Sequence, residues 1–188
     1  MVKIIKTAPL DEPNFIKPIA ITYELDGLKK RWEAVISHDA VSILLYNTDR
    51  NSFVLVKQFR PPVLNANKSN GYTYELCAGI IDKDLSDKEI AREEVLEECG
   101  YDVPLKSIEK ITSYYTSVGI SGALQTLYYA EINDTMILNE GGGLEEENIE
   151  VIYLLIEEAK AFMFDETYQK TPGLMLAFYW FFDNHLKV

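Results

Sequence analysis

The segment GIIDKDLSDKEIAREEVLEECGY, residues 79–101, decides the interpretation of this chain. Within it, SDKE at residues 86–89 is a capping-box sequence, in which Ser86 and Glu89 satisfy free backbone N–H groups at the start of a helix. Gly100 ends the pattern, because glycine readily adopts the left-handed backbone that often follows the last helical turn. The segment therefore predicts a helix between Ser86 and Gly100.

This predicted helix carries a high density of carboxylates. Residues three and four apart share a helix face, so Glu94, Glu97 and Glu98 bring their side chains together. Each like-charged pair spaced by four residues would cost a few tenths of a kcal/mol in an isolated helix. A hard cation such as Mg²⁺ reverses that cost, since it binds carboxylate and phosphate oxygens. A solvated acidic face explains the same pattern without a metal, and the helix alone leaves both interpretations open.

Strand patterns lie on both sides of the helix. Runs rich in β-branched and aromatic residues precede and follow it, and an aromatic-rich helix beginning at Pro172 closes the chain. This order predicts a mixed α/β fold with a helix on each side of a sheet. The predicted strands are Ala40–Asn47, Ser52–Phe59, Tyr72–Gly79, Ile108–Ser113, Leu124–Glu131 and Val151–Ile156.

The N-terminal region predicts a separate small sheet. ITYELDGLKKRWEAVI, residues 21–36, indicates a β-hairpin that turns at Asp26–Gly27. Two strands cannot bury a core by themselves, so this hairpin must pack on the main domain or on another subunit. We therefore expect an N-terminal β-sheet region over residues 1–38 and a second domain over residues 39–188.

Composition limits the function classes. The chain has 18 basic and 30 acidic residues, a net charge of −12, which disfavours binding to nucleic acid or to an anionic membrane. Cys77 and Cys99 make no disulfide framework, and no signal peptide or membrane-spanning run is apparent. We expect a cytoplasmic protein. If its ligand is nevertheless a phosphate compound, metal ions must offset the carboxylates locally.

Residues 79–101 resemble the Nudix box, G-x5-E-x7-R-E-U-x-E-E-x-G-U, where U is apolar. Two positions depart from it: Leu85 replaces the first glutamate and Glu93 replaces the arginine. The segments VLVKQFRPP, ELCAG, TSVGISG and GGLEEE also resemble the branch of this family that acts on nucleoside diphosphate sugars. The box residues in register are Gly79, Glu94, Val95, Glu97, Glu98, Gly100 and Tyr101.

The resemblance implies a Nudix α/β/α sandwich that hydrolyses a nucleoside diphosphate sugar with Mg²⁺, or with Mn²⁺ in its place. UDP-glucose, giving UMP and glucose 1-phosphate, is the first expected substrate, and ADP-ribose is the second. The branch is typically dimeric through its N-terminal sheet, which implies a homodimer here.

The resemblance also implies roles for particular residues. Metal ligands are the box glutamates Glu94, Glu97 and Glu98 and the main-chain carbonyl of Ala78, with Glu97 and Glu98 catalytic. A base or further ligand comes from the late acidic loop, for which Glu146 and then Glu147 are predicted. Trp32 and Glu75 also have structural explanations, in packing and hydrogen bonding, and Arg31 matches a position that can reach the partner's substrate. The substrate-binding residues implied are Arg60, Arg31, Trp32, Glu75, Ser117 and Gly119.

Two other function classes fit parts of the sequence. A Nudix-fold binding module with weak catalysis is favoured by Leu85 and Glu93. A calcium-binding interaction protein is suggested by the EF-hand-like run from Asp82 to Glu93, but Asp87 occupies the place of the loop glycine.

Overall fold

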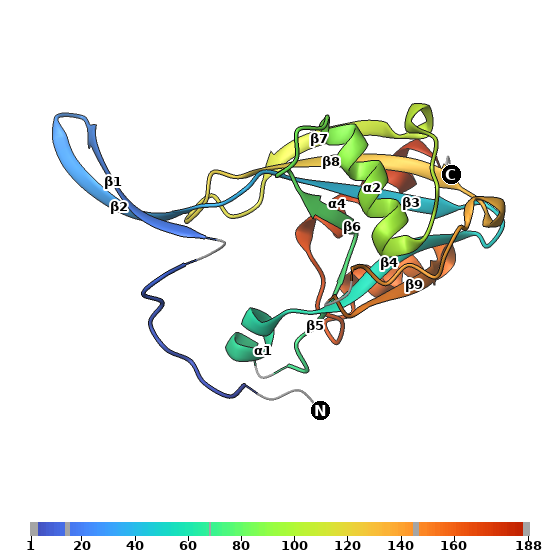
Figure 1. The fold of residues 1–188 in the computed structure, drawn as a ribbon, viewed down its shortest axis with the longest axis horizontal. Coiled ribbons are helices and arrows are strands. Elements are labelled where there is room, and N and C mark those ends of the chain that lie inside the picture. Colours follow the sequence, from blue (N-terminus) through green and yellow to red (C-terminus); the bar gives the residue numbers. More distant parts are fainter. Residues whose placement is uncertain (1–3, 14–15, 68, 145–146, 186–188) are drawn as a thin grey trace.

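The computed structural model describes residues 4–13, 16–67, 69–144 and 147–185, and separates into a two-stranded hairpin and a seven-stranded sheet (Figure 1). The hairpin joins β1 (Lys17–Leu25) to β2 (Leu28–Ile36). Asp26 and Gly27 form its turn, both with positive φ, which confirms the predicted hairpin. It projects away from the main sheet as an arm (Figure 1).

The main sheet combines parallel and antiparallel pairs. β3 and β8 are parallel neighbours at its centre, and the other pairs are antiparallel. The predicted strand over residues 72–79 is two strands, because the chain breaks at Leu76 and changes partner there. The strands are β3 (Ala40–Asn47), β4 (Ser52–Phe59), β5 (Tyr72–Glu75), β6 (Cys77–Ile80), β7 (Glu109–Tyr115), β8 (Leu124–Ile132) and β9 (Ile149–Leu155).

The sheet opens between β3 and β4. β3 pairs with β4 only where residues 45–47 face residues 52–54. Beyond that point β3 pairs with β6 and β4 pairs with β5, so β5 and β6 line the two sides of the opening. Tyr74 on β5 donates its backbone N–H to the Gln169 carbonyl, which brings the segment before the last helix into the same opening.

Helices cover both faces of the sheet, in agreement with the predicted mixed α/β class. α2 (Asp87–Cys99) has both hydrogen bonds of the capping box at Ser86 and Glu89, and Gly100 ends it with φ of 79°. The sequence patterns do not predict α1 or α3, which are too short to show a helical period. The remaining helices are α1 (Pro61–Asn67), α3 (Ile156–Phe164) and α4 (Pro172–Asn184), with 3-10 turns at η1 (Leu105–Ser107) and η2 (Asp134–Met136).

Two hydrophobic clusters hold these layers together. One joins the sheet to α2 and includes Ile90 and Val95, and the other joins the opposite face to α3 and α4. In the second cluster Phe53 of β4 stacks on Phe178 of α4, with ring centroids 4.3 Å apart and both side chains fully buried. No helix of the described residues is both long and apolar enough to cross a membrane.

The Phe53–Phe178 stack should dominate the attachment of α4. We expect Phe178→Ala to lower the free energy of unfolding by about 3–5 kcal/mol, because it removes a buried ring and leaves a cavity. Urea unfolding followed by circular dichroism measures the change. Tyr179→Ala, an exposed neighbour on the same helix, should cost less than about 1 kcal/mol. Equal losses in the two variants would contradict this account of the core.

Candidate active site

Glu98 is the most deeply buried acid of the α2 carboxylate face. Its side chain is only 5% exposed, and one carboxylate oxygen accepts the backbone N–H of Ala78 at 2.9 Å. The N–H and C=O of one strand residue point to the same edge of the strand. The Ala78 carbonyl, the main-chain ligand that the resemblance implies, therefore faces the same side of β6 as the Glu98 carboxylate.

Gly79 makes room for a second carboxylate. A Cβ atom on Gly79 would overlap the side chain of Glu94, so any larger residue would displace that glutamate. β6 and α2 therefore approach closely at this point, and Glu94 and Glu98 lie against adjacent residues of one strand.

Burial raises the pKa values of both carboxyls. The pKa of Glu98 rises to about 7, chiefly through desolvation, although the Ala78 N–H favours the ionised form. The pKa of Glu94 also rises to about 7, again chiefly through desolvation and then through repulsion by Glu97. The fold therefore holds two carboxyl groups in a desolvated place, where a bound cation would favour their ionised forms.

The donor set suits a hard divalent cation. Carboxylate and carbonyl oxygens are the ligands that Mg²⁺ prefers, and no thiol or imidazole is needed. Among the residues that the structure describes, no three acidic, histidine or cysteine side chains already converge into a metal centre. The chemistry of Glu94, Glu97, Glu98 and Ala78 fits a metal, while their assignment as ligands stays a prediction.

A glycine-rich loop closes over the C-terminal end of α2. The N–H groups of Gly142 and Gly143 donate to the carbonyls of Glu98 and Glu97, at 2.9 and 3.0 Å. Both glycines have positive φ, which L side chains rarely adopt. These bonds satisfy helix carbonyls that would otherwise lack partners, and they fix where the acidic loop begins.

Glu147 lies close enough to the site to affect its charge. Its negative charge contributes to the raised pKa values of both Glu94 and Glu98. Its carboxylate accepts the backbone N–H of Leu144 at 3.1 Å, which orders the loop locally. Glu146, the other predicted loop residue, lies outside the described residues, as does Glu145.

Arg60 and Glu75 form a two-bond ion pair at the opening of the sheet. Arg60 Nε and one terminal nitrogen each donate to Glu75 at 2.8 Å, and the Thr73 hydroxyl also donates to that carboxylate. The guanidinium lowers the pKa of Glu75 against the effect of burial. The structure thus brings these two predicted substrate-binding residues together, and Glu98 and Glu147 add to the negative potential around Arg60.

The unusual Glu93 has a partner that sequence reasoning missed. Lys83, in the loop before α2, donates to the Glu93 carboxylate at 2.8 Å. Its charge also opposes the raised pKa of Glu94. A positive charge therefore lies beside the α2 carboxylates although the box arginine is missing. The sequence does not predict this pair, because a lysine and a glutamate ten residues apart form no recognisable local pattern.

The predicted residues of the hairpin lie apart from the α2 carboxylates. Trp32 Nε1 donates to the Gly119 carbonyl at 2.8 Å, and the Ser117 carbonyl accepts N–H groups within its own turn. Arg31 pairs with Glu33 on the exposed arm. Among the described contacts, no hydrogen bond or ion pair joins Arg31, Trp32 or Ser117 to α2. The bond from Trp32 to Gly119 attaches the arm to the loop between β7 and β8.

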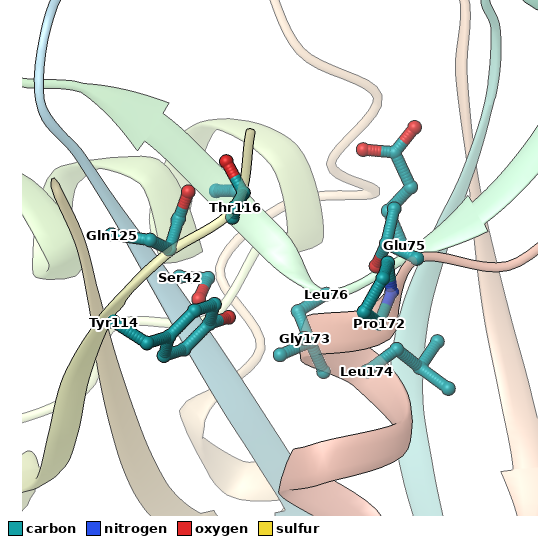
Figure 2. A pocket seen from close by; sticks show the side chains of 11 residues that line it. Ser42, Glu75, Leu76, Tyr114, Thr116, Gln125, Pro172, Gly173 and Leu174 are labelled. Atoms are coloured by element: carbon teal, nitrogen blue, oxygen red, sulfur yellow. The ribbon is translucent and has the colours of Figure 1, made fainter. Parts of the chain in front are cut away.

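A cavity of about 240 Å³ adjoins the opening on its α4 side (Figure 2). Glu75 and Ala78 contribute to its wall, so it borders the candidate metal site. Ser42, Tyr114 and Gln125 also line it, from β3, β7 and β8. These three are scattered over separate strands, and no sequence motif marks them.

Comparisons with known proteins identify the family and the relatives of this chain. Residues 36–172 match the NUDIX domain family. The chain is 37% identical over 196 residues to uridine diphosphate glucose pyrophosphatase of Bos taurus, covering 89% of this chain and 88% of that protein. It is 37% identical over 163 residues to GDP-mannose pyrophosphatase of Cronobacter sakazakii, covering 84% and 83%. The corresponding Pectobacterium atrosepticum protein is 40% identical over 141 residues, covering 73% and 70%.

The buried carboxyls predict how stability depends on pH in the absence of metal. Between about pH 4.5 and pH 7 the unfolded chain releases the Glu98 proton while the folded chain retains it, so folding loses stability as pH rises. One pKa unit corresponds to about 1.4 kcal/mol, and the loss attributable to Glu98 should be on the order of 3 kcal/mol. Glu98→Gln should remove it.

Urea unfolding in chelator at pH 5 and pH 8 measures this difference between the wild type and Glu98→Gln. Glu157→Gln, which alters an exposed acid at the start of α3, is the control and should follow the wild type at both pH values. A difference between wild type and Glu98→Gln that does not change with pH would contradict the assignment.

Proposed function

The chain belongs to the Nudix family of pyrophosphohydrolases, and we propose that it hydrolyses a nucleoside diphosphate sugar at the opening of the sheet, which has α2 on one side and α4 on the other. The observation that carries this proposal is the pair of desolvated carboxyls, Glu94 and Glu98, held against Gly79 and Ala78. The proteins that it resembles are named as pyrophosphatases of UDP-glucose and GDP-mannose. UDP-glucose, giving UMP and glucose 1-phosphate, is the first proposed substrate, and ADP-ribose is the second.

Nudix enzymes generally use a divalent metal such as Mg²⁺, which when bound neutralises the diphosphate and lowers the pKa of a bound water. In this proposal Glu94, Glu97, Glu98 and the Ala78 carbonyl hold the metal. The Ala78 N–H fixes the orientation of Glu98, and Gly79 leaves space for Glu94. Lys83 limits the repulsion among these acids by pairing with Glu93.

Arg60 and Glu147 are the proposed groups on the opposite side of the diphosphate. The planar guanidinium of Arg60 can donate two hydrogen bonds to a phosphate, and its pairing with Glu75 already orients it. Glu147 lies in the loop that follows the Gly142–Gly143 segment, and its carboxylate accepts the Leu144 N–H. A carboxylate at this position can accept a proton from water. Glu146 remains a proposed alternative to Glu147.

We further propose that a second copy of this chain covers the arm. Cross-strand pairing puts apolar side chains on one face of the hairpin, including Ile21 opposite Trp32 and Leu25 opposite Leu28. All four are more than 40% exposed, and a two-stranded sheet lacks a core of its own. Pairing of two arms would bury these faces and carry Arg31 toward the other subunit's substrate.

We also propose a cytoplasmic location and no nucleic-acid or membrane partner. Cys77 and Cys99 are free and buried, which suits a reducing cytoplasm. The net charge of −12 supports the absence of nucleic-acid and membrane partners.

Hydrolysis of a substrate panel tests the activity. With Mg²⁺, UDP-glucose should yield UMP and glucose 1-phosphate, faster than ADP-ribose yields AMP, as measured by chromatography of the products. Chelator should abolish both reactions, and Glu98→Gln should lower kcat by at least about 100-fold because a transition-state charge contact is lost. Glu157→Gln should remain fully active. Full activity in Glu98→Gln would overturn the proposed metal site.

The arm should determine the oligomeric state. We expect Ile21→Lys to convert a dimer into a monomer in sedimentation velocity, because it places a charge on the apolar face of the hairpin. Thr22→Lys changes the adjacent residue on the opposite face and should leave the dimer intact. Dissociation by both variants, or by neither, would contradict pairing through this face.

Mixing two inactive variants tests whether Arg31 acts in the partner's site. A heterodimer of Arg31→Ala and Glu98→Gln subunits has one site with both residues intact if Arg31 comes from the partner. Activity should therefore reappear when the two variants are unfolded and refolded together. No recovery, with heterodimers demonstrated by a size-tagged subunit, would place Arg31 in its own subunit's site or outside the mechanism.

A further inference from the structure

The cavity on the α4 side of the opening is separate from the carboxylate face of α2. Even-numbered residues of this part of β3 face α4, while Val41 and Ile43 face α2. Ser42 therefore projects to the α4 side, as do its pairing neighbours Ala78 and Leu127. We call this space, lined by Ser42, Leu76, Tyr114, Gln125 and the start of α4, the α4 cavity.

Ser42 carries a buried hydroxyl without a partner. Its residue is 5% exposed, and Ser42 Oγ makes no hydrogen bond within the described structure. The hydroxyl lies near enough to the Tyr114 phenol to affect its pKa, but the pair does not reach hydrogen-bonding geometry. A buried hydroxyl without a partner is unfavourable, and a polar ligand in the cavity would offset that cost by hydrogen bonding to it.

The start of α4 adds unpaired backbone donors from the other side. Thr171 provides no side-chain cap, Pro172 has no N–H, and the first hydrogen bond into the helix is from Met175 N–H to the Thr171 carbonyl. The N–H groups of Gly173 and Leu174 have no partner among the described residues. Figure 2 shows Pro172 and Gly173 across the cavity from Tyr114 and Ser42.

Gly173 also sets how closely this wall approaches Tyr114. A Cβ atom at Gly173 would overlap the Tyr114 hydroxyl, so a larger residue would push the phenol out of place. The position of Tyr114 beside Ser42 therefore depends on the glycine at the second residue of α4.

The lining favours a neutral polyhydroxyl ligand over an anion. Among the described residues, no lysine or arginine lines the α4 cavity, and Glu75 is the charged residue in its wall. A phosphate there would have no cation to pair with, in a protein of net charge −12. The lining instead combines hydroxyl and amide side chains with the apolar surfaces of Leu76, Tyr114 and Pro172. A sugar ring likewise presents hydroxyl groups around its edge and C–H groups on its faces.

We propose that the α4 cavity is the subsite for the hexose of the nucleoside diphosphate sugar. Ser42, Gln125 and the free N–H groups of Gly173 and Leu174 bind the hexose hydroxyls. The cavity shares Glu75 and Ala78 with the candidate diphosphate site, so a hexose there is adjacent to the phosphate that carries it. This inference rests on the proposed function for its substrate class, and it assigns sugar selectivity to residues outside the Nudix box.

Ser42→Ala tests the subsite without disturbing the fold. Removing an unpartnered hydroxyl should leave the melting temperature unchanged or raise it. Loss of a single hydrogen bond should raise KM for UDP-glucose and the inhibition constant for glucose 1-phosphate by about 3- to 10-fold, with the inhibition constant for UMP unchanged. Ser52→Ala removes the other buried unpartnered hydroxyl, which is not in the cavity, and should change none of these constants. Parallel changes in the constants for UMP and glucose 1-phosphate would overturn the proposal.

A binding measurement separates failure of the subsite from failure of the proposed activity. Titration of ¹⁵N-labelled protein with glucose 1-phosphate and Mg²⁺ should shift the amide resonances of Gly173 and Leu174, and Ser42→Ala should weaken this binding. UMP should leave these two resonances in place. If UDP-glucose is not hydrolysed but these shifts occur, the result contradicts the proposed activity and supports the subsite. Hydrolysis of UDP-glucose without any shift at Gly173 or Leu174 would contradict the hexose subsite and support the proposed activity.

Discussion

The contact between the Ala78 N–H and the buried Glu98 carboxylate is the constraint on which the site depends. A carboxyl that is 5% exposed is costly to ionise, and a single backbone donor only partly offsets that cost. The bond attaches α2 to the inner edge of β6 and leaves the neighbouring Gly79 close against Glu94. The same contact that positions the helix therefore also concentrates its charge.

Contacts at both ends hold α2 in place, so its carboxylates stay beside β6. Ser86 and Glu89 close its first turn, and the backbone of the Gly142–Gly143 segment closes its last turn. The second closure also determines where the acidic loop begins and brings Glu147 to the site. Together these contacts hold several carboxylates in one region, where a divalent cation and a diphosphate are proposed to bind together.

The opening of the sheet gives a physical reason for the proposed division of the substrate between the α2 side and the α4 side. β5 and β6 diverge at Leu76, with Glu98 on the α2 side and Ser42 on the α4 side of the same gap. Several carboxylates lie on the first side, whereas the second side is lined by neutral polar groups, apolar surface and Glu75. In the proposed assignment, diphosphate chemistry and sugar recognition use different side chains on the two sides of the gap.

The sequence by itself determined the features that depend on near neighbours along the chain. The limits of α2, its carboxylate face, the hairpin at Asp26–Gly27 and the mixed α/β class follow from turn, capping and periodic patterns. Tertiary structure alone decided the contacts between distant residues: Ala78 with Glu98, Arg60 with Glu75, Lys83 with Glu93, and the walls of the α4 cavity. Their geometry depends on strand order and register, since the apolar pattern continues through Leu76 and conceals the break at which the sheet opens. Local patterns specify most of the elements, but only packing places their polar groups opposite one another.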